Sequence, residues 1–269
     1  MTTVHVGLPS LRGSLARYAE RFDLLEVRPV DTPLPKPAKT RAWRKEVPPA
    51  FVFSVVLPSI VSSLRQTPEA DAALATTLEH AAALEARCLV LVTQPDVTPT
   101  ALNKRRLAAL VERLPRDVVT VAWEPRGLWS TEETGALGRE LDLAIVSDVT
   151  RDAPARGPVL YTRLRGIGAG ARSSAAGLER ARLAFSGRRG VYAVVECDGA
   201  ARVAKALREP LAPAARVAAG SVVRPAARLS AEDEEQGPRS GPPRRRPRTR
   251  RRTRRRRPSR PDPRRSRRR

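Results

Sequence analysis

The chain has 269 residues, of which 51 are lysine or arginine and 28 are aspartate or glutamate, and its formal net charge is +23. Most of this excess lies at one end, because residues 238–269 contain 18 arginines and one aspartate, whereas residues 1–237 contain 33 basic and 27 acidic side chains. No apolar run approaches the ~20 residues that cross a bilayer, and two cysteines and two histidines are too few for a disulfide framework or a zinc site. We therefore expect a cytoplasmic protein with no membrane partner, metal or cofactor, in which an ordinary body precedes a cationic tail.

The first part of the body alternates strand and helix patterns. In chain order, apolar segments and helical spacing predict a strand at Thr2–Leu8, a helix at Ser10–Phe22, a strand at Leu24–Arg28, a short helix at Thr40–Val47, a strand at Phe51–Leu57 and a helix at Pro68–Ala86. The last of these is the clearest helix, since a proline fits the first helical turn.

The alternation continues to about Leu211. The pattern predicts strands at Cys88–Thr93, Val118–Glu124, Leu143–Ser147, Val159–Arg165 and Gly190–Glu196, with helices at Thr100–Leu114, Ser130–Leu141, Ser174–Phe185 and from Asp198 or Gly199 to about Glu209. Thr100 is an expected N-cap, and Ser130 with Glu133 fits a capping box. No helix is expected after the sixth strand, because residues 148–158 contain two prolines, a glycine and no periodicity.

Eight strands of nearly continuous apolar character are typical of a parallel sheet that is buried on both faces. Eight βα units in ~210 residues indicate an α/β fold, a small TIM-type (β/α)8 barrel that lacks a helix after strand six. A doubly wound open sheet is the alternative, but no GxGxxG loop follows the first strand. We expect the barrel over residues 1–211, a flexible linker with an acidic segment over 212–237, and a disordered arginine-rich tail over 238–269.

Several short motifs occur one after another along the body. They are Tyr18-Ala19 and Phe22 before Leu25-Glu26-Val27, Trp43 before Pro48-Pro49 and Phe51–Val55, Glu124-Pro125-Arg126 with Trp129, Asp148, Tyr161–Gly166, and Val191-Tyr192. Their order and spacing resemble the YecE-like family, domain of unknown function 72, and the chain is identified as a divergent member with an added tail. The resemblance covers about residues 1–205 and implies a TIM-type barrel, but no established activity.

The chain also departs from that family's pattern. A family lysine is Val56 here, a family histidine is Arg165, and the asparagines after the last strand are replaced around Glu196-Cys197-Asp198. These replacements favour a binding protein or a barrel that has lost its chemistry over an enzyme, and they leave the question of catalysis open.

Polar residues follow most of the predicted strands, at the barrel end where TIM barrels place their active sites. Because arginine forks hold phosphate or carboxylate, we expect an anionic, phosphate-bearing small molecule or a nucleic-acid terminus at a site formed by Glu26, Arg28, Gln94, Arg126, Arg163 and Arg165. Glu196 and Asp198 complete the rim. The arginines argue against Mg²⁺ on the carboxylates.

Two carboxylates in this rim allow other functions. Glu124 and Asp148 are candidate acid/base residues of a metal-independent hydrolase or lyase. Alternatively, they pair with Arg126 and Arg163 in a closed network, and the barrel is catalytically inert.

Other candidates are weaker. Cys197 ends the eighth strand, but neither His5 nor His80 is placed to activate it, so we expect a buried, inert thiol. His5 is expected to be a core histidine, and Trp43 and Trp129 are expected to be packing residues.

The arginine-rich tail predicts RNA or DNA binding, because so dense a positive charge attracts polyanions. The tail has no aromatic residue for base stacking, so this binding should tolerate any sequence and weaken steeply with salt. A role in solubility alone is the alternative. The candidate residues are Arg244, Arg245, Arg246, Arg250, Arg251, Arg252, Arg254, Arg255, Arg256 and Arg257.

Overall fold

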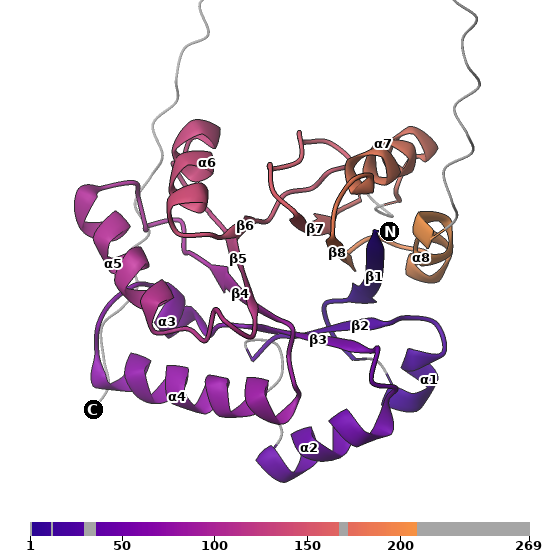
Figure 1. Ribbon diagram of the computed structural model, residues 1–269, viewed down its shortest axis with the longest axis horizontal. Coiled ribbons are helices and arrows are strands. Elements are labelled where there is room, and N and C mark those ends of the chain that lie inside the picture. Colours follow the sequence, from indigo (N-terminus) through magenta and orange to yellow (C-terminus); the bar gives the residue numbers. More distant parts are fainter. Residues whose placement is uncertain (1, 12, 30–35, 167–171, 209–269) are drawn as a thin grey trace, which may run out of the picture. The chain divides into compact units, whose positions relative to one another are not determined.

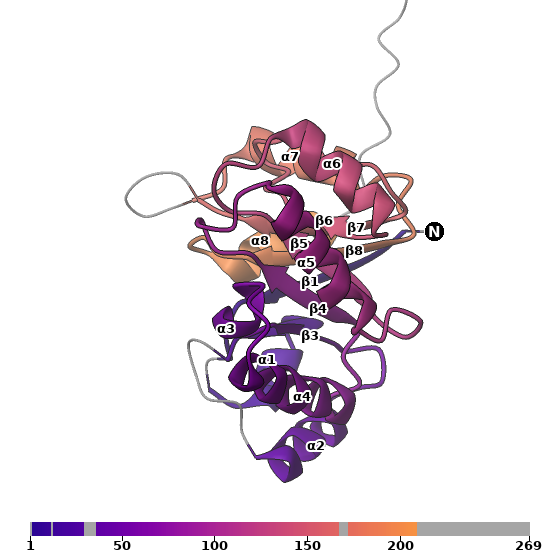
Figure 2. The same ribbon diagram turned by 90° about the vertical axis from the view of Figure 1, so that its left-hand side faces the viewer.

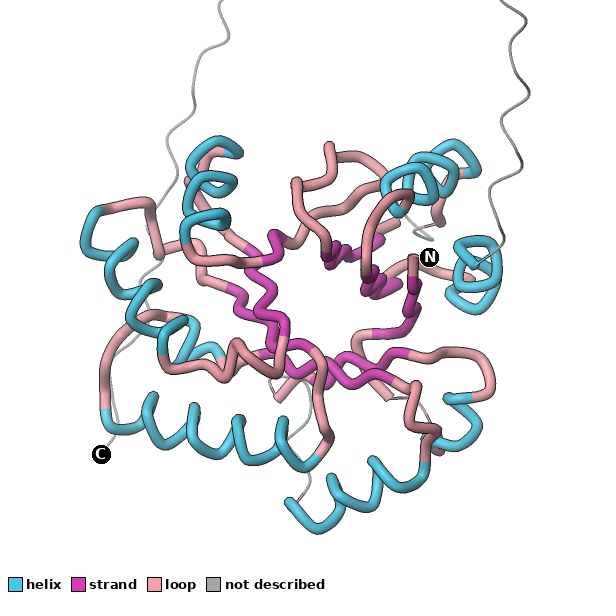
Figure 3. The backbone as a smooth tube through the Cα atoms, in the orientation of Figure 1, coloured by secondary structure: helices cyan, strands magenta, loops and turns pink. Residues whose placement is uncertain are grey.

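The computed structural model describes residues 2–11, 13–29, 36–166 and 172–208. Within them, eight strands form one parallel sheet: β1 (Thr3–Leu8), β2 (Leu24–Val27), β3 (Val52–Val56), β4 (Cys88–Val92), β5 (Thr120–Glu124), β6 (Ala144–Ile145), β7 (Val159–Leu164) and β8 (Gly190–Val195). The strand order is β6-β5-β4-β3-β2-β1-β8-β7, so β1 pairs with both β2 and β8. The strands form a ring inside the helices (Figure 3), which confirms the TIM-type barrel. The expected linker and tail, residues 212–269, lie outside the described residues.

The ring is weakest between β6 and β7. β6 has only two residues, and its segment meets β7 through a single parallel bridge between Ser147 and Thr162. The Arg163 N–H donates to the Ser147 carbonyl at 3.2 Å, and the Thr162 hydroxyl donates to the same carbonyl at 2.7 Å. As predicted, no helix lies between these two strands. The barrel is therefore nearly closed, with one thin seam.

Helices surround the sheet (Figure 1). They are α1 (Leu15–Ala19), α2 (Pro37–Glu46), α3 (Ser59–Ser62), α4 (Pro68–Ala83), α5 (Ala101–Glu112), α6 (Thr131–Glu140), α7 (Ala175–Phe185) and α8 (Ala200–Arg208). In the view turned by 90°, α2 and α4 lie on one side of the strands and α6 and α7 on the other (Figure 2). No described helix has the length and apolar character needed to span a membrane.

The predicted helix starts are partly confirmed. Thr100 caps α5 with its side-chain oxygen, and Ser130 and Glu133 form the expected capping box of α6. The predicted helix at Ser10–Phe22 is wrong in extent, because Ser14 is the N-cap of α1 and Gly13 adopts a left-handed φ of 81°. The short helix α3 was not predicted.

Two apolar layers hold the fold together. The larger one lies between helices and sheet, and its largest fully buried side chain is Trp123. The smaller one fills the barrel interior with the inward residues of alternating strand positions, among them Val52, Val56, Val90 and Tyr161. Because side chains alternate along a strand, the same inward phase carries Glu26, Glu124 and Arg163 toward the carboxyl ends of their strands.

Candidate functional site

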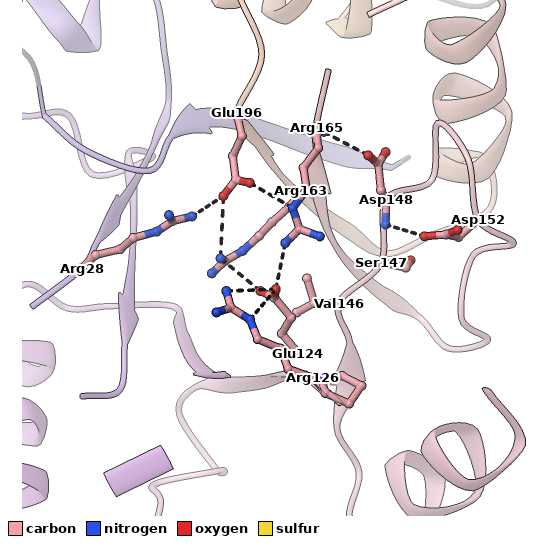
Figure 4. Close-up of a pocket in the computed structure, with 11 residues that line it drawn as sticks. Arg28, Glu124, Arg126, Val146, Ser147, Asp148, Asp152, Arg163, Arg165 and Glu196 are labelled. Carbon is pink, nitrogen blue, oxygen red and sulfur yellow. Dashed lines mark hydrogen bonds and ion pairs between the residues drawn. The ribbon is translucent and has the colours of Figure 1, made fainter. Parts of the chain in front are cut away.

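The carboxyl ends of the strands surround a cavity of about 480 Å³. Its wall includes four arginines, Arg28, Arg126, Arg163 and Arg165, together with Glu124, Asp148, Asp152 and Glu196 (Figure 4). Glu26 lies beneath them and is completely buried. The cavity therefore has a dense, mixed lining of arginines and carboxylates.

Glu26 is held by donors from three residues. Its Oε1 accepts from Arg28 Nε at 2.6 Å, and its Oε2 accepts from the Tyr161 hydroxyl at 2.5 Å and from Arg163 Nη2 at 2.8 Å. Tyr161 in turn accepts from the Ser54 hydroxyl at 2.8 Å. Burial, and then the charge of Glu26, raise the pKa of Tyr161 well above its ordinary value. The phenol therefore remains a proton donor to the carboxylate at neutral pH.

Arg163 is the central cation of the site. Its side chain is almost fully buried, and it lies 3.0 Å from Glu124 Oε2 and 3.7 Å from Glu196 Oε1, besides its bond to Glu26. Its Nε is buried and has no hydrogen-bond partner among the described residues. Removing a buried, paired charge leaves its partners with less compensation, so the buried glutamates depend on Arg163 for theirs.

Glu196 connects the outer arginines. It pairs with Arg28, and its Oε2 accepts from Arg165 Nε at 3.1 Å. Burial alone would raise the pKa of Glu196, but the hydrogen bond and charge of Arg28 and the charges of Arg163 and Arg165 outweigh it and lower the pKa. Arg165 also donates to Glu124 Oε1 at 2.8 Å, which completes an alternating chain of carboxylates and guanidinium groups (Figure 4).

Arg126 is the least engaged of these arginines. Its side chain is 47% exposed, and its contacts with Glu124 Oε1 are long, at 3.5 Å from both Nε and Nη2. Arg165 is exposed to a similar degree, at 42%, whereas Arg28 is mostly buried. The side chains of Arg126 and Arg165 are therefore the most exposed of the four arginines in the cavity wall.

Asp148 lies beside this chain of ion pairs (Figure 4). Its Oδ1 accepts from the Thr150 hydroxyl at 2.6 Å and from the Thr150 N–H at 3.1 Å, and its Oδ2 accepts from the Arg165 N–H at 3.0 Å. The nearest guanidinium is that of Arg151, at 3.6 Å. This carboxylate thus fixes the loop after β6 to the end of β7, and it forms no ion pair with Arg126 or Arg163.

Other predicted residues lie elsewhere. Gln94 is half-buried and is not among the residues that line the cavity. His5 stacks on Tyr192 within the barrel, and the Trp129 indole donates to the Val97 carbonyl at 2.6 Å. The candidate arginines of residues 244–257 lie outside the described residues.

Two further predicted residues, Cys197 and Asp198, also do not line the cavity. Cys197 is buried, with its sulfur 3.1 Å from the Ser173 hydroxyl. Asp198 is exposed and does not line the cavity. Within the described residues, no group of three or more His, Cys, Asp or Glu side chains could hold a metal ion.

Sequence reasoning missed Tyr161, the hydroxyl that supports Glu26. It stands two residues before Arg163 in the same strand, so it shares the inward face. That spacing could have indicated that Tyr161 lies near Glu26. In a strand of apolar residues, however, a tyrosine is more often a packing residue of the core. Asp152, which accepts from the Asp148 N–H at 3.4 Å, was missed because it lies in a segment without periodicity.

The family model described as "Protein of unknown function DUF72" matches residues 5–225. The chain belongs to this family. A crystal structure of a DUF72 family protein from Enterococcus faecalis is 18% identical, with a TM-score of 0.62 over 76% of this chain and 96% of that one. A DUF72 family protein from Thermotoga maritima is 16% identical, with a TM-score of 0.59 over 76% and 96% of the two chains.

The same fold occurs beyond the family. A xylose isomerase domain containing protein from Salmonella typhimurium is 17% identical, with a TM-score of 0.53 over 76% of this chain and 93% of that one. No curated protein sequence matches the chain. At these identities the similarity establishes the DUF72 barrel and no reaction.

Proposed function

We propose that the barrel mouth binds a small anionic ligand that carries a phosphate group. The observation that supports this is the cavity of about 480 Å³ with four arginines in its wall, two of them about half exposed. Guanidinium forks match phosphate oxygens in geometry as well as in charge. Arg126 and Arg165 would bind the anion, while Arg163 would keep its ion pairs with the buried Glu26 and Glu124.

The carboxylates around the cavity favour a ligand that also bears hydroxyl groups. Glu124, Glu196 and the exposed Asp152 offer acceptor oxygens beside the arginines. A sugar phosphate presents both kinds of partner, since its hydroxyls donate to carboxylates and its phosphate accepts from arginines. A ligand with several anionic groups and no donors would instead face repulsion from these carboxylates.

The test compares ligand-induced stabilisation in variants of the full chain. Ribose 5-phosphate should raise the melting temperature of the wild-type protein, because a ligand that binds only the folded state stabilises it. Arg126→Gln should weaken this effect about tenfold in apparent affinity, since a charge-assisted contact is lost. Arg105→Gln removes the same charge from an exposed position on α5 and serves as the matched control.

All of these variants keep the same C-terminal arginines, so nonspecific phosphate binding there is constant. Equal stabilisation of the wild type, the Arg126 variant and the Arg105 variant would contradict the proposal. Glu124→Gln separates binding from the alternative of a metal-independent hydrolase or lyase. A binding site keeps much of its affinity in this variant, whereas an acid/base enzyme loses turnover.

We also propose that residues 238–269 bind RNA or DNA through charge in the cytoplasm. This part of the proposal rests on the sequence alone, with 18 arginines in 32 residues. Fluorescence anisotropy with single-stranded RNA, titrated in rising salt, should give a steep decrease in log affinity with log salt. Replacing the ten candidate arginines named in the sequence analysis by glutamine should flatten that slope, whereas Arg126→Gln should leave it unchanged. An unchanged slope in the tail variant would assign the binding to the barrel.

A further inference from the structure

A second cavity, of about 360 Å³, lies at the opposite end of the barrel. Residues at the start of several strands line it, among them Thr3 of β1, Thr120 of β5 and Gly190 of β8. The amino ends of the strands meet there, away from the mouth with its ion pairs. Nothing in the proposed function uses this cavity.

The charges at this end are unbalanced. Arg87 and Arg189, which immediately precede β4 and β8, both line the cavity, and no aspartate or glutamate is among its described lining residues. Both side chains are exposed, and neither has a hydrogen bond or an ion pair with another described residue. At the mouth, by contrast, every arginine has a glutamate partner. Two guanidinium groups beside one cavity, without a carboxylate in its wall, are suited to an anion.

Neutral donors complete the lining. Thr3, Thr120 and Tyr192, each of which carries a hydroxyl, line the same cavity. Burial, and then the neighbouring Cys88, raise the pKa of Tyr192 to about 12, so its hydroxyl keeps its proton at neutral pH. Hydroxyl donors next to arginines are the partners that a tetrahedral oxyanion accepts from.

We propose that this cavity is a second anion site, which takes a small phosphate ester or inorganic phosphate between Arg87 and Arg189. His5 is the reporter of this site, because its ring lines the cavity. Burial lowers the pKa of His5; Asp23, 3.8 Å from Nδ1, opposes this shift, while Arg208 and Arg87 add to it. A bound anion favours the protonated ring and therefore raises this pKa.

The test uses the full chain with ¹³C-labelled histidines, because His5 and His80 are the only two in the sequence. His80 is buried on α4 with its Nδ1 3.2 Å from the Thr40 hydroxyl, so it is an internal control for the fold. Inorganic phosphate at constant ionic strength should shift the NMR signal of His5 saturably and raise the pKa of His5. The NMR signal of His80 should not change. Sodium chloride should produce no saturable shift.

Matched variants locate the site. Arg87→Gln and Arg189→Gln should each weaken the apparent phosphate affinity at His5 about tenfold, the loss expected for one charge-assisted contact. Arg105→Gln and Arg126→Gln should leave it unchanged, so failure here is distinguishable from failure of the site at the mouth. If chloride and phosphate move His5 alike, or if the Arg87 and Arg189 variants respond like the Arg105 variant, the second site does not exist.

Discussion

Arg163→Met should destabilise the barrel far more than the loss of a surface arginine. Methionine has a similar length but no charge, so the substitution leaves the completely buried Glu26 with Arg28 as its remaining cation. It also removes the guanidinium 3.0 Å from Glu124.

The expected magnitude follows from the burial of the pair. Removing one partner of a buried ion pair costs about 3–5 kcal/mol, because the charges that remain lose compensation. Here Glu26 keeps only Arg28, and Glu124 keeps only the partly exposed Arg126 and Arg165. Solvent screening does not reduce this value, since the side chains of Arg163 and Glu26 are 3% and 0% exposed. At about 2–4 °C per kcal/mol for a domain of this size, the melting temperature should fall by about 6–20 °C.

Urea unfolding followed by circular dichroism measures this loss. Arg65→Met is the control, because Arg65 and Asp96 form a long, exposed pair that contributes at most about 1 kcal/mol. The double variant Arg163→Met/Glu26→Gln also removes the Glu26 charge that the single variant leaves without Arg163. It should therefore be more stable than the sum of the two single losses implies. The reasoning is refuted if Arg163→Met costs no more than the control, or if the two single losses simply add.

Four further substitutions test other parts of the structure. Tyr161→Phe should cost about 1–3 kcal/mol in urea unfolding, because Glu26 loses a donor and the buried Ser54 hydroxyl loses its acceptor; a neutral effect would remove Tyr161 from the network. Glu196 has a lowered pKa in the folded state, so its stabilisation is complete above its unfolded value of 4.5 and is lost as the pH falls through the lowered value. The stability difference between the wild type and Glu196→Gln should therefore shrink on acidification below pH 4.5, and a growing difference would contradict the assigned sign. Gly7→Ala should abolish stable folding in thermal melts, because a Cβ at this position would lie 1.8 Å from the Leu24 carbonyl oxygen, whereas Gly135→Ala in α6 meets only a flexible arginine at 3.5 Å and should stabilise by about 0.5–1 kcal/mol.

The fold could be predicted because it depends on local patterns that repeat. Eight apolar segments and the spacing between them define the barrel, and the prolines of residues 148–158 exclude a helix after β6. Where tertiary contacts set an element's limits, the prediction failed. α1 is short because the Tyr18 hydroxyl accepts from the Leu8 N–H and donates to the Leu24 carbonyl, which anchors its single turn between two strands.

The site could be predicted only as a set of residues. Strand ends placed Glu26, Glu124 and Arg163 at one end of the barrel, but the choice of partners depends on strand register and on the direction of each side chain. Asp148 illustrates the limit, since its carboxylate binds backbone N–H groups that no sequence pattern marks. The second cavity could not be predicted in this way, because Arg87 and Arg189 precede their strands, whereas the active sites of TIM barrels lie at the carboxyl ends of the strands.

The ion pairs at the mouth also bear on how the barrel closes. Glu124 ends β5, and Arg163 and Arg165 lie in and just after β7, so their bonds cross over β6 at the position where backbone pairing is a single bridge. Asp148 adds a bond from the loop after β6 to the Arg165 N–H. Side-chain charges thus connect β5 to β7 across the seam, where the backbone pairing between the β6 segment and β7 is a single bridge. An anion held by Arg126 and Arg165, as we propose, would compete with Glu124 for the Arg165 guanidinium and would thus couple occupancy of the mouth to the stability of this seam.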